Sequence, residues 1–480
     1  MAEYDRPGAY DYRTLTIRNF NDSQKVDIKN VVVEMVIYED FASNTLIGHL
    51  ILYDALDLIH TLPIIGEEEI DLHVVNAGEL NNGYDTATAE SSADIKKKSE
   101  IKGTFKAYNI SEIQRDSVSR AQAYKLEFVS PEFYKNIRSQ ISQAYTGKTI
   151  NNYVNSIFTN SLYEKDETPK KIDIEPTNSI QDFVIPAMTP FEAMQFLAGR
   201  SYSGKNKSSS FVFYESHWGF HFITLESFFR EPTSEKLYLT IANIADEKNH
   251  GHNIERDEIE RNIISRHRIE HTNDILLSSH AGLYGSSTLT HDLLRKTYKT
   301  HSFNYKSDWE SDSPMKHIDD FKLSTAESKN HKQIPGDLSF ISTNLNQNQN
   351  KYVMERIGWM RPRIIRPFNL ELFKNAERSL MAQMNTLTMN VVVPGNTDRM
   401  PGQIVEVDLP TASNLESLKL NKYLSGRWMI MNVRHSFSVD DYSTTMQLVK
   451  NSYPIDIEKE TARINKIEEA NKGKRSGTTQ

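Results

Sequence analysis

The stretch Leu424–Tyr453, LSGRWMIMNVRHSFSVDDYSTTMQLVKNSY, predicts one long β-hairpin. Apolar and polar side chains alternate along its first half, as in a strand with one buried face. The apolar set is Met429, Met431, Val433 and Phe437, and the polar set is Asn432, Arg434 and Ser436. Asp440 and Asp441 supply the turn, because Asp hydrogen-bonds its own backbone. The alternation then resumes, with Tyr442, Met446 and Leu448 against Ser443, Thr445 and Gln447. Such a hairpin belongs in a sheet or barrel wall that meets solvent on one side.

The composition is typical of a globular protein. Its 480 residues suffice for roughly three domains, and 22 Tyr with 21 Phe favour β-rich walls and interfaces. The net charge of −8 gives no general reason to expect nucleic-acid binding. Without cysteine the chain forms no disulfide, thiolate zinc site or cysteine nucleophile. Met1–Arg6 lacks an apolar core and no run reaches about 18 apolar residues, so we expect neither a signal peptide nor a membrane span.

Further strand patterns surround the hairpin. We predict a β-rich α+β fold with two similar tube-type β-barrels and inserted helical or mixed segments. Val31–Tyr38 is apolar enough for a helix, but its adjacent valines favour a strand. The predicted organisation is a polar arm at 1–12, a first barrel at 13–130 completed by 206–240, an inserted helical domain at 131–205, a second barrel at 256–308 completed by 386–453, an insertion with a connecting helix at 309–385, and a charged tail at 454–480.

Helical spacing marks the inserted segment. Apolar side chains recur every four residues after Ser130-Pro131, which fits an N-cap followed by the first helical position. We expect one helix through Phe133, Ile137, Ile141 and Tyr145, and a second through Tyr153, Ile157, Phe158 and Leu162. Thr189 and Glu192 fit the capping box of a third helix. Gly199–Lys205 has the glycine–lysine spacing of a phosphate loop, but Asn206 lacks the metal-binding hydroxyl, and a helix precedes the loop. We interpret it as a helix-to-strand connection.

Histidines and carboxylates are the candidate metal-binding and acid–base residues of this sequence. Seven histidines lie between 250 and 301, namely His250, His252, His267, His271, His280, His291 and His301. His267 and His271 could share a strand face, as could His217 and His221, but no carboxylate at a suitable spacing completes a metal site. We interpret these histidines as surface or partly buried residues of a sheet. The alternative is that they bind a metal ion on the threefold axis of an oligomer. Glu67-Glu68-Glu69 reads as a charged strand edge rather than the two carboxylates of a glycosidase, which face each other across a cleft.

Arg356–Arg366 interleaves arginines with Trp359. Such mixing can bind nucleic acid, but Arg and Trp are also the usual anchors of protein interfaces, which we favour. No Ser–His–Asp or GxSxG arrangement stands in a strand–turn–helix context. We therefore assign no catalytic, cofactor-binding or metal residue and expect no enzyme.

The closing hairpin also resembles a known family. Its pattern SGxWxIxxVxH, a turn, and YxTxxxLVKxS is similar to the closing hairpin of baseplate central hub proteins of contractile-tailed bacteriophages, a family shared with the N-terminal hub of type VI secretion spike proteins. Four further regions resemble the family in order: 54–75, 125–148, 210–229, and 387–410 with its layout VVVPGNTDRMPGQIVEVDLP. The fold-signature or interface candidates are Pro63, Gly66, Glu67, Trp218, Gly219, Trp359, Arg361, Gly426, Trp428, His435 and Tyr442.

The resemblance implies a structural role in a phage virion. It implies a homotrimer whose two barrels per chain form a pseudo-sixfold ring, joining the sixfold tail tube to the threefold central spike. Implied partners are the spike, tube, tape measure and baseplate wedge proteins, with DNA only in transit through the channel and no membrane. Assembly would take place in the host cytoplasm. The alternatives are a hub of a phage-tail-like secretion or injection system, and a tail-associated cell-wall hydrolase.

Overall fold

The computed structural model of the chain describes most of its length. The described residues are 7–19, 24–55, 57–76, 100–115, 121–165, 167–178, 180–239, 262–272, 274–292, 297–310, 317–319, 321–323, 338–341, 354–357, 361–364, 371–384, 386–411, 420–439 and 441–476. Residues 77–99 lie outside the described residues.

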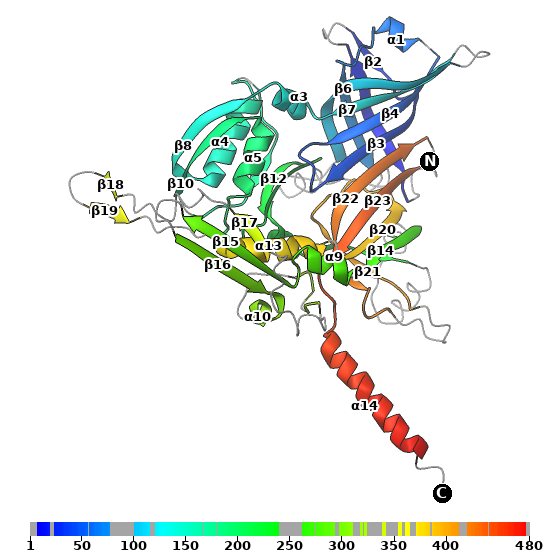
Figure 1. Cartoon of the computed structure of the whole chain (residues 1–480). Coiled ribbons are helices and arrows are strands. Elements are labelled where there is room, and N and C mark those ends of the chain that lie inside the picture. Colours follow the sequence, from blue (N-terminus) through cyan, green and yellow to red (C-terminus); the bar gives the residue numbers. More distant parts are fainter. Residues whose placement is uncertain are drawn as a thin grey trace, which may run out of the picture.

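One 13-stranded sheet organises the molecule, in the order β14-β20-β23-β22-β3-β4-β7-β6-β5-β1-β2, with β21 and then β13 branching from β22 (Figure 1). Its strands are β1 Tyr10–Arg18, β2 Lys25–Asp27, β3 Val32–Asp40, β4 Ile47–Asp54, β5 Glu69–Asn76, β6 Glu100–Arg115, β7 Gln122–Val129, β13 Thr233–Tyr238, β14 Arg266–Thr272, β20 Leu387–Pro394, β21 Ile404–Asp408, β22 Gly426–Ser438 and β23 Tyr442–Lys450. The short helix α1, Leu58–Thr61, caps the end near β2 and β6. The strand assigned to Val31–Tyr38 is confirmed as β3.

The closing hairpin β22–β23 joins the two halves of this sheet. The first part of β22 pairs with β21 through Val407↔Gly426 and its neighbours, and the last part pairs with β3 up to Ser438↔Glu34. A bulge between Ile430 and Asn432 separates the two parts. Because a bulge changes which face a side chain occupies, Ile430 is fully buried whereas Met431 is only partly buried, contrary to the simple alternation.

Each half of the sheet has its own hydrophobic core. The first contains Leu15, Ile37, Leu50, Leu72, Leu126 and Phe437, and the second contains Met389, Val391, Val407, Trp428, Ile430 and Leu448. The β-rich α+β class is thus confirmed. The strand ladders of the described residues do not close into two barrels, however; in the second half only an isolated bridge between Tyr238 and Ile263 joins β13 to the segment entering β14.

The inserted unit at 131–229 mixes helices and strands. Its elements are α3 Pro131–Ile137, β8 Ile141–Thr149, α4 Ile150–Leu162, β9 Ile172–Ile174, β10 Ile180–Met188, α5 Pro190–Ala198, β11 Phe211–Ser216, β12 Gly219–Thr224 and α6 Leu225–Phe229. The second and third predicted helices are confirmed as α4 and α5, the latter with the Thr189–Glu192 capping box. The first predicted helix ends at Ile137, as α3. Its predicted continuation through Ile141 and Tyr145 is wrong, since both residues lie on one face of β8, which pairs with β10. A spacing of four residues also repeats on a strand.

The observed strand pairing departs in part from the predicted barrel completions, although β14 does pair with β20 of the segment 386–453. In 206–240, β11 and β12 pair with β9 outside the large sheet, and β13 pairs with β21 of the second half. In 256–308, only β14 joins the large sheet. Strands β15 Gly285–Asp292, β16 Thr297–Asn304 and β17 Leu338–Ile341 form a separate sheet, packed with helix α13, Glu371–Met384, which confirms the predicted connecting helix. Helix α9, Ile275–His280, precedes β15, and helix α10, Tyr305–Glu310, follows β16.

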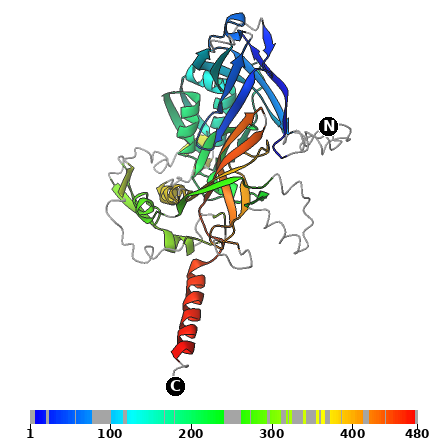
Figure 2. The ribbon, with the colours of Figure 1, turned by 90° about the vertical axis from the view of Figure 1, so that its right-hand side faces the viewer.

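The remaining described elements lie at the edges. Strands β18 Met354–Ile357 and β19 Arg361–Ile364 form a two-stranded hairpin. The charged tail contains helix α14, Ile457–Ser476, which projects away from the body in both ribbon views (Figures 1 and 2). Among the described residues, no helix is long and apolar enough to span a bilayer.

Candidate functional site

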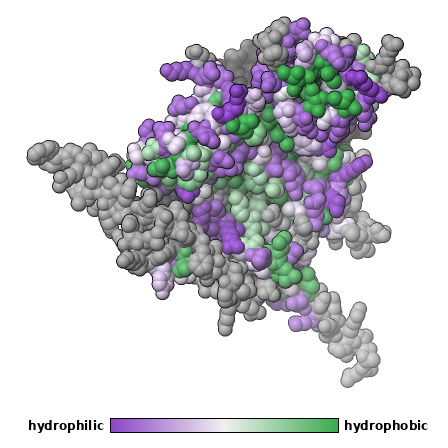
Figure 3. Space-filling view, turned by 45° about the horizontal axis from the view of Figure 1, so that its top comes forward, coloured by the Kyte–Doolittle hydropathy of each residue, from purple (hydrophilic) through white to green (hydrophobic). Residues whose placement is uncertain are grey.

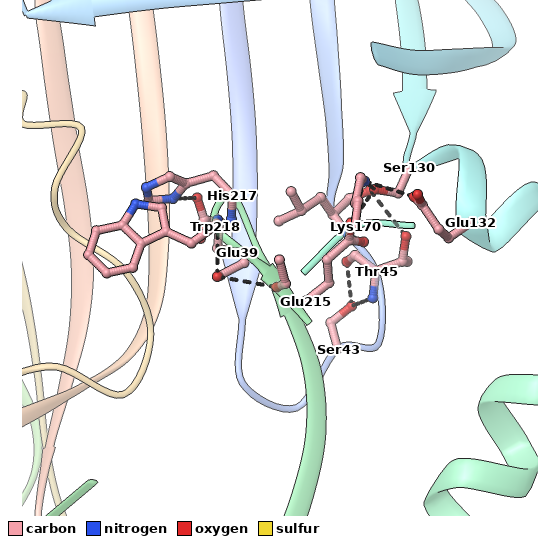
Figure 4. A network of polar contacts seen from close by, with 12 residues as sticks. Glu39, Ser43, Thr45, Ser130, Glu132, Lys170, Glu215, His217 and Trp218 are labelled. Carbon is pink, nitrogen blue, oxygen red and sulfur yellow. Dashed lines mark hydrogen bonds and ion pairs between the residues drawn. The ribbon is translucent and has the colours of Figure 1, made fainter. Parts of the chain in front are cut away.

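The inserted unit meets the large sheet through the β11–β12 hairpin. The tip of this hairpin lies beside the end of β3 and the loop that follows it (Figure 4). The turn requires Gly219, because its φ is 135° and an added Cβ would overlap the Lys171 carbonyl. The hairpin thus carries polar side chains from the inserted unit into the junction.

Glu215 of β11 forms the first buried network at this junction. Its Oε2 accepts a hydrogen bond from the Leu46 amide at 2.9 Å, and its Oε1 accepts from the Ser130 hydroxyl at 2.6 Å and from Lys170 Nζ at 2.8 Å. Lys170 also pairs with Glu132 at 2.7 Å. Burial raises the pKa of Glu215, and the pKa of Lys170 is raised because the two carboxylates outweigh the effect of its burial. The network fastens β11 to the β3–β4 loop and to the start of α3.

Glu39 of β3 forms the second network with two histidines. Its Oε1 lies 2.7 Å from His217 Nδ1 and 3.4 Å from His435 Nε2, and its Oε2 accepts from the His217 backbone amide at 3.2 Å. His435 Nδ1 lies 2.7 Å from the Tyr442 hydroxyl. Burial alone would raise the pKa of Glu39, but the two imidazoles outweigh it and lower this pKa to about 2, while burial lowers the pKa of His435. Two histidines from distant parts of the chain therefore share the buried carboxylate of Glu39.

A groove of about 770 Å³ adjoins this junction. Residues of β9 and β12 form one side of it and the segment 398–404 lines it as well, and its lining includes Lys171, Asp173, Trp218, Asp398, Met400 and Gln403. The ring of Trp218, which lines the groove, lies 5.7 Å from that of His217, so one side chain separates the groove from the Glu39 network.

The structure gathers four of the predicted signature residues at this junction. Trp218 and Gly219 lie at the hairpin turn, and His435 and Tyr442 belong to the same network. Gly426 and Trp428 lie at the opposite end of β22, where Trp428 is fully buried in the second core and Gly426 has a φ of 110°.

The other signature residues lie far from the junction. Pro63 and Glu67 are exposed near α1, and Gly66, with a φ of 93°, packs against the Tyr108 backbone. Figure 3 shows apolar surface at the end of the molecule that carries α1, where Ile65 is exposed. Trp359 lies outside the described residues, as do the side chains of Arg361 and the rest of the arginine-rich segment.

The acidic run does not behave as one strand edge. Glu67 is exposed, but Glu68 is buried and accepts hydrogen bonds from the amides of Ile65 and Gly66. Glu69 pairs with Arg18 and Lys106. The run is therefore not one charged strand edge: Glu67 faces solvent, Glu68 accepts backbone hydrogen bonds, and Glu69 forms ion pairs. The Gly199–Lys205 segment is a loop from α5 toward β11, as interpreted from the sequence.

Sequence reasoning missed Glu39, Glu215 and Lys170, and it did not associate His217 with His435. A signal was present for Glu39, which shares the inward face of β3 with Met35 and Ile37. A carboxylate on a buried strand face needs a partner. Among the histidines of 250–301, His267 and His280 are exposed, and His250 and His252 lie outside the described residues.

Comparisons with known proteins place this fold among phage tail components. The chain resembles the crystal structure of the 43 kDa tail protein of prophage MuSo2 from Shewanella oneidensis, with a TM-score of 0.50, 8% identity, and coverage of 91% of this chain and 98% of that one. The tail protein of Neisseria meningitidis MC58 aligns with a TM-score of 0.49 and 10% identity over 93% of this chain and 99% of that one.

One curated relative matches along nearly the whole chain. It is the probable baseplate hub protein gp334 of Vibrio phage KVP40, 22% identical over 440 residues, which are 88% of this chain and 91% of the relative. No protein-family model matches the chain. The resemblance to baseplate hub proteins that the closing hairpin suggested is confirmed.

Proposed function

We propose that this chain is a structural hub protein of a phage tail baseplate. The observation that carries the proposal is the similarity to a probable baseplate hub protein over 88% of the chain, together with a tail-protein fold. The site geometry supports a structural role, because the ionisable groups at the junction are engaged in buried contacts between segments. Such contacts fix the relative placement of domains rather than expose a reactive group.

The proposed assembly is a homotrimer in the virion baseplate. One chain carries two β-sheet halves with separate cores, and three chains would present six such halves around a channel. That ring would join the sixfold tail tube to the threefold central spike, with DNA passing through it only in transit. The inserted unit and the segment 309–385 would lie outside the ring and contact neighbouring wedge proteins. The tape measure protein would meet the channel, and assembly would occur in the host cytoplasm.

Light scattering coupled to size-exclusion chromatography tests the assembly. A mass near three times 55.2 kDa at micromolar concentration is expected for the purified chain. Cross-linking mass spectrometry of intact virions then tests the partners, with links expected to the spike and tube proteins. A persistent monomer together with no cross-link to either protein would contradict the proposal.

A further inference from the structure

Three potential metal ligands meet at the junction between the inserted unit and the large sheet. They come from Glu39 in β3, His217 at the β11–β12 turn and His435 in β22, and one ligand atom from each lies within 4.8 Å of the other two. We propose that these residues form a structural site for a divalent transition-metal ion, with zinc as the natural occupant, that fastens the inserted unit to the sheet.

The spacing of the ligand atoms suits a tetrahedral ion. Zinc bound at about 2.0–2.2 Å by nitrogen and oxygen places its ligands about 3.3–3.6 Å apart. Glu39 Oε1 and His435 Nε2 already lie 3.4 Å apart. Glu39 Oε1 and His217 Nδ1 lie 2.7 Å apart, a hydrogen-bond distance that would lengthen by about 0.7 Å around the ion. The required movement is small enough for side-chain rotation.

The hydrogen-bond partners leave ring nitrogens available for a metal. Tyr442 lies 2.7 Å from His435 Nδ1, so this nitrogen can donate its proton to the Tyr442 hydroxyl. In that tautomer the Nε2 atom directs its lone pair toward Glu39 Oε1 at 3.4 Å and has no proton to donate to it. Two acceptors facing each other in a buried site are favoured when a cation lies between them. A metal-ligating histidine characteristically donates its other ring proton to such a partner.

The ligand set and its surroundings select a transition metal. Two imidazoles and one carboxylate suit zinc better than calcium or magnesium, which prefer oxygen ligands. All three side chains are almost fully buried, with His217 at 1% exposed and both others at 0%. A water molecule would complete the tetrahedron, and its ionisation would offset the remaining positive charge.

Metal retention by the full-length chain tests the site. The purified protein is stripped with a chelator, incubated with zinc chloride, passed through gel filtration and analysed by mass spectrometry for metal. We expect close to one zinc ion per chain, and cobalt(II) in its place should give the visible absorption of a tetrahedral site. Glu39→Gln and His435→Gln should lose retention. Tyr442→Phe, which removes only the outer partner of His435, should weaken zinc affinity about 10–100-fold.

A matched control is His221→Gln. His221 lies on the neighbouring strand β12 and hydrogen-bonds Ser216, but it contributes no ligand. This variant should retain zinc as the wild type does. The proposal is overturned if the wild type retains no zinc, or if Glu39→Gln and His435→Gln retain as much. Should the ligand variants not fold, zinc X-ray absorption of the wild type decides: two imidazoles support the site, and ligands without imidazole refute it.

Discussion

Replacing Glu215 with alanine should loosen the inserted unit from the sheet. Glu215 is fully buried and pairs with Lys170 at 2.8 Å while also accepting from the Leu46 amide and the Ser130 hydroxyl. Breaking a buried ion pair by removing one partner costs about 3–5 kcal/mol, and the lower end applies here because the Lys170 side chain is 31% exposed and keeps its ion pair with Glu132. An amide left without its acceptor adds about 1–3 kcal/mol. We therefore expect a loss of at least about 4 kcal/mol in the free energy of unfolding of the inserted unit.

The matched control is Glu167→Ala, which removes the ion pair between Glu167 and Lys135. Both partners of that pair are exposed by a third or more, so its removal should cost about 0–1 kcal/mol. For a cooperative unit of 60–100 residues, the size of the inserted unit at 131–229, 1 kcal/mol shifts Tm by about 4–8 °C, so Glu215→Ala should lower the first thermal transition by about 15 °C or more.

Differential scanning calorimetry measures the transition, and hydrogen exchange locates the change. Exchange should accelerate in β11 and the β3–β4 loop of Glu215→Ala, while β20 in the second half stays protected. If Glu215→Ala unfolds within the range of Glu167→Ala, or if exchange increases uniformly, the junction does not depend on this network and the reasoning is refuted.

Three further predictions concern buried groups. Burial outweighs hydrogen bonds from Ser208 and Ser210 and raises the pKa of Glu226 to about 7, so stability should fall as pH rises from 4.5 to 7. Glu226→Gln should raise Tm at pH 8 but not at pH 5, and an equal effect at both would contradict this. The pKa of Glu39 is depressed to about 2, so its stabilisation is complete above pH 4.5 and is lost as pH falls toward 2. Acid titration should show about 3 kcal/mol lost across that window in the wild type and not in Glu39→Gln. Gly48→Ala should cost about 1–3 kcal/mol in denaturant unfolding, because its Cβ would lie 2.6 Å from Phe128 Cε2. Gly103→Ala, whose Cβ would meet only Phe105 at 3.5 Å, is the control, and equal losses would contradict the steric argument.

The sequence by itself determined the elements whose causes are local. The alternation in 424–453 predicted the hairpin β22–β23, and Thr189 with Glu192 predicted the start of α5. The ordered resemblance to hub proteins identified the class, and the comparisons confirm it. The capping box involves residues only three positions apart, and the alternation in 424–453 is the same whichever strand pairs with the hairpin, so both can be recognised in the sequence.

Only the tertiary structure decided which strands meet and where ionisable groups gather. Ile141 and Tyr145 repeat at a spacing that both helix and strand satisfy, and pairing with β10 selects the strand. The bulge in β22 places Ile430 rather than Met431 in the core, which the alternation could not reveal. Glu39 and His217 are 178 residues apart, and local propensity carries no information about such a contact. The β11–β12 hairpin brings His217 to Glu39, and the pairing of β22 with β3 brings His435 to it. Burial of the Glu39 charge is tolerated only in an arrangement that supplies such partners.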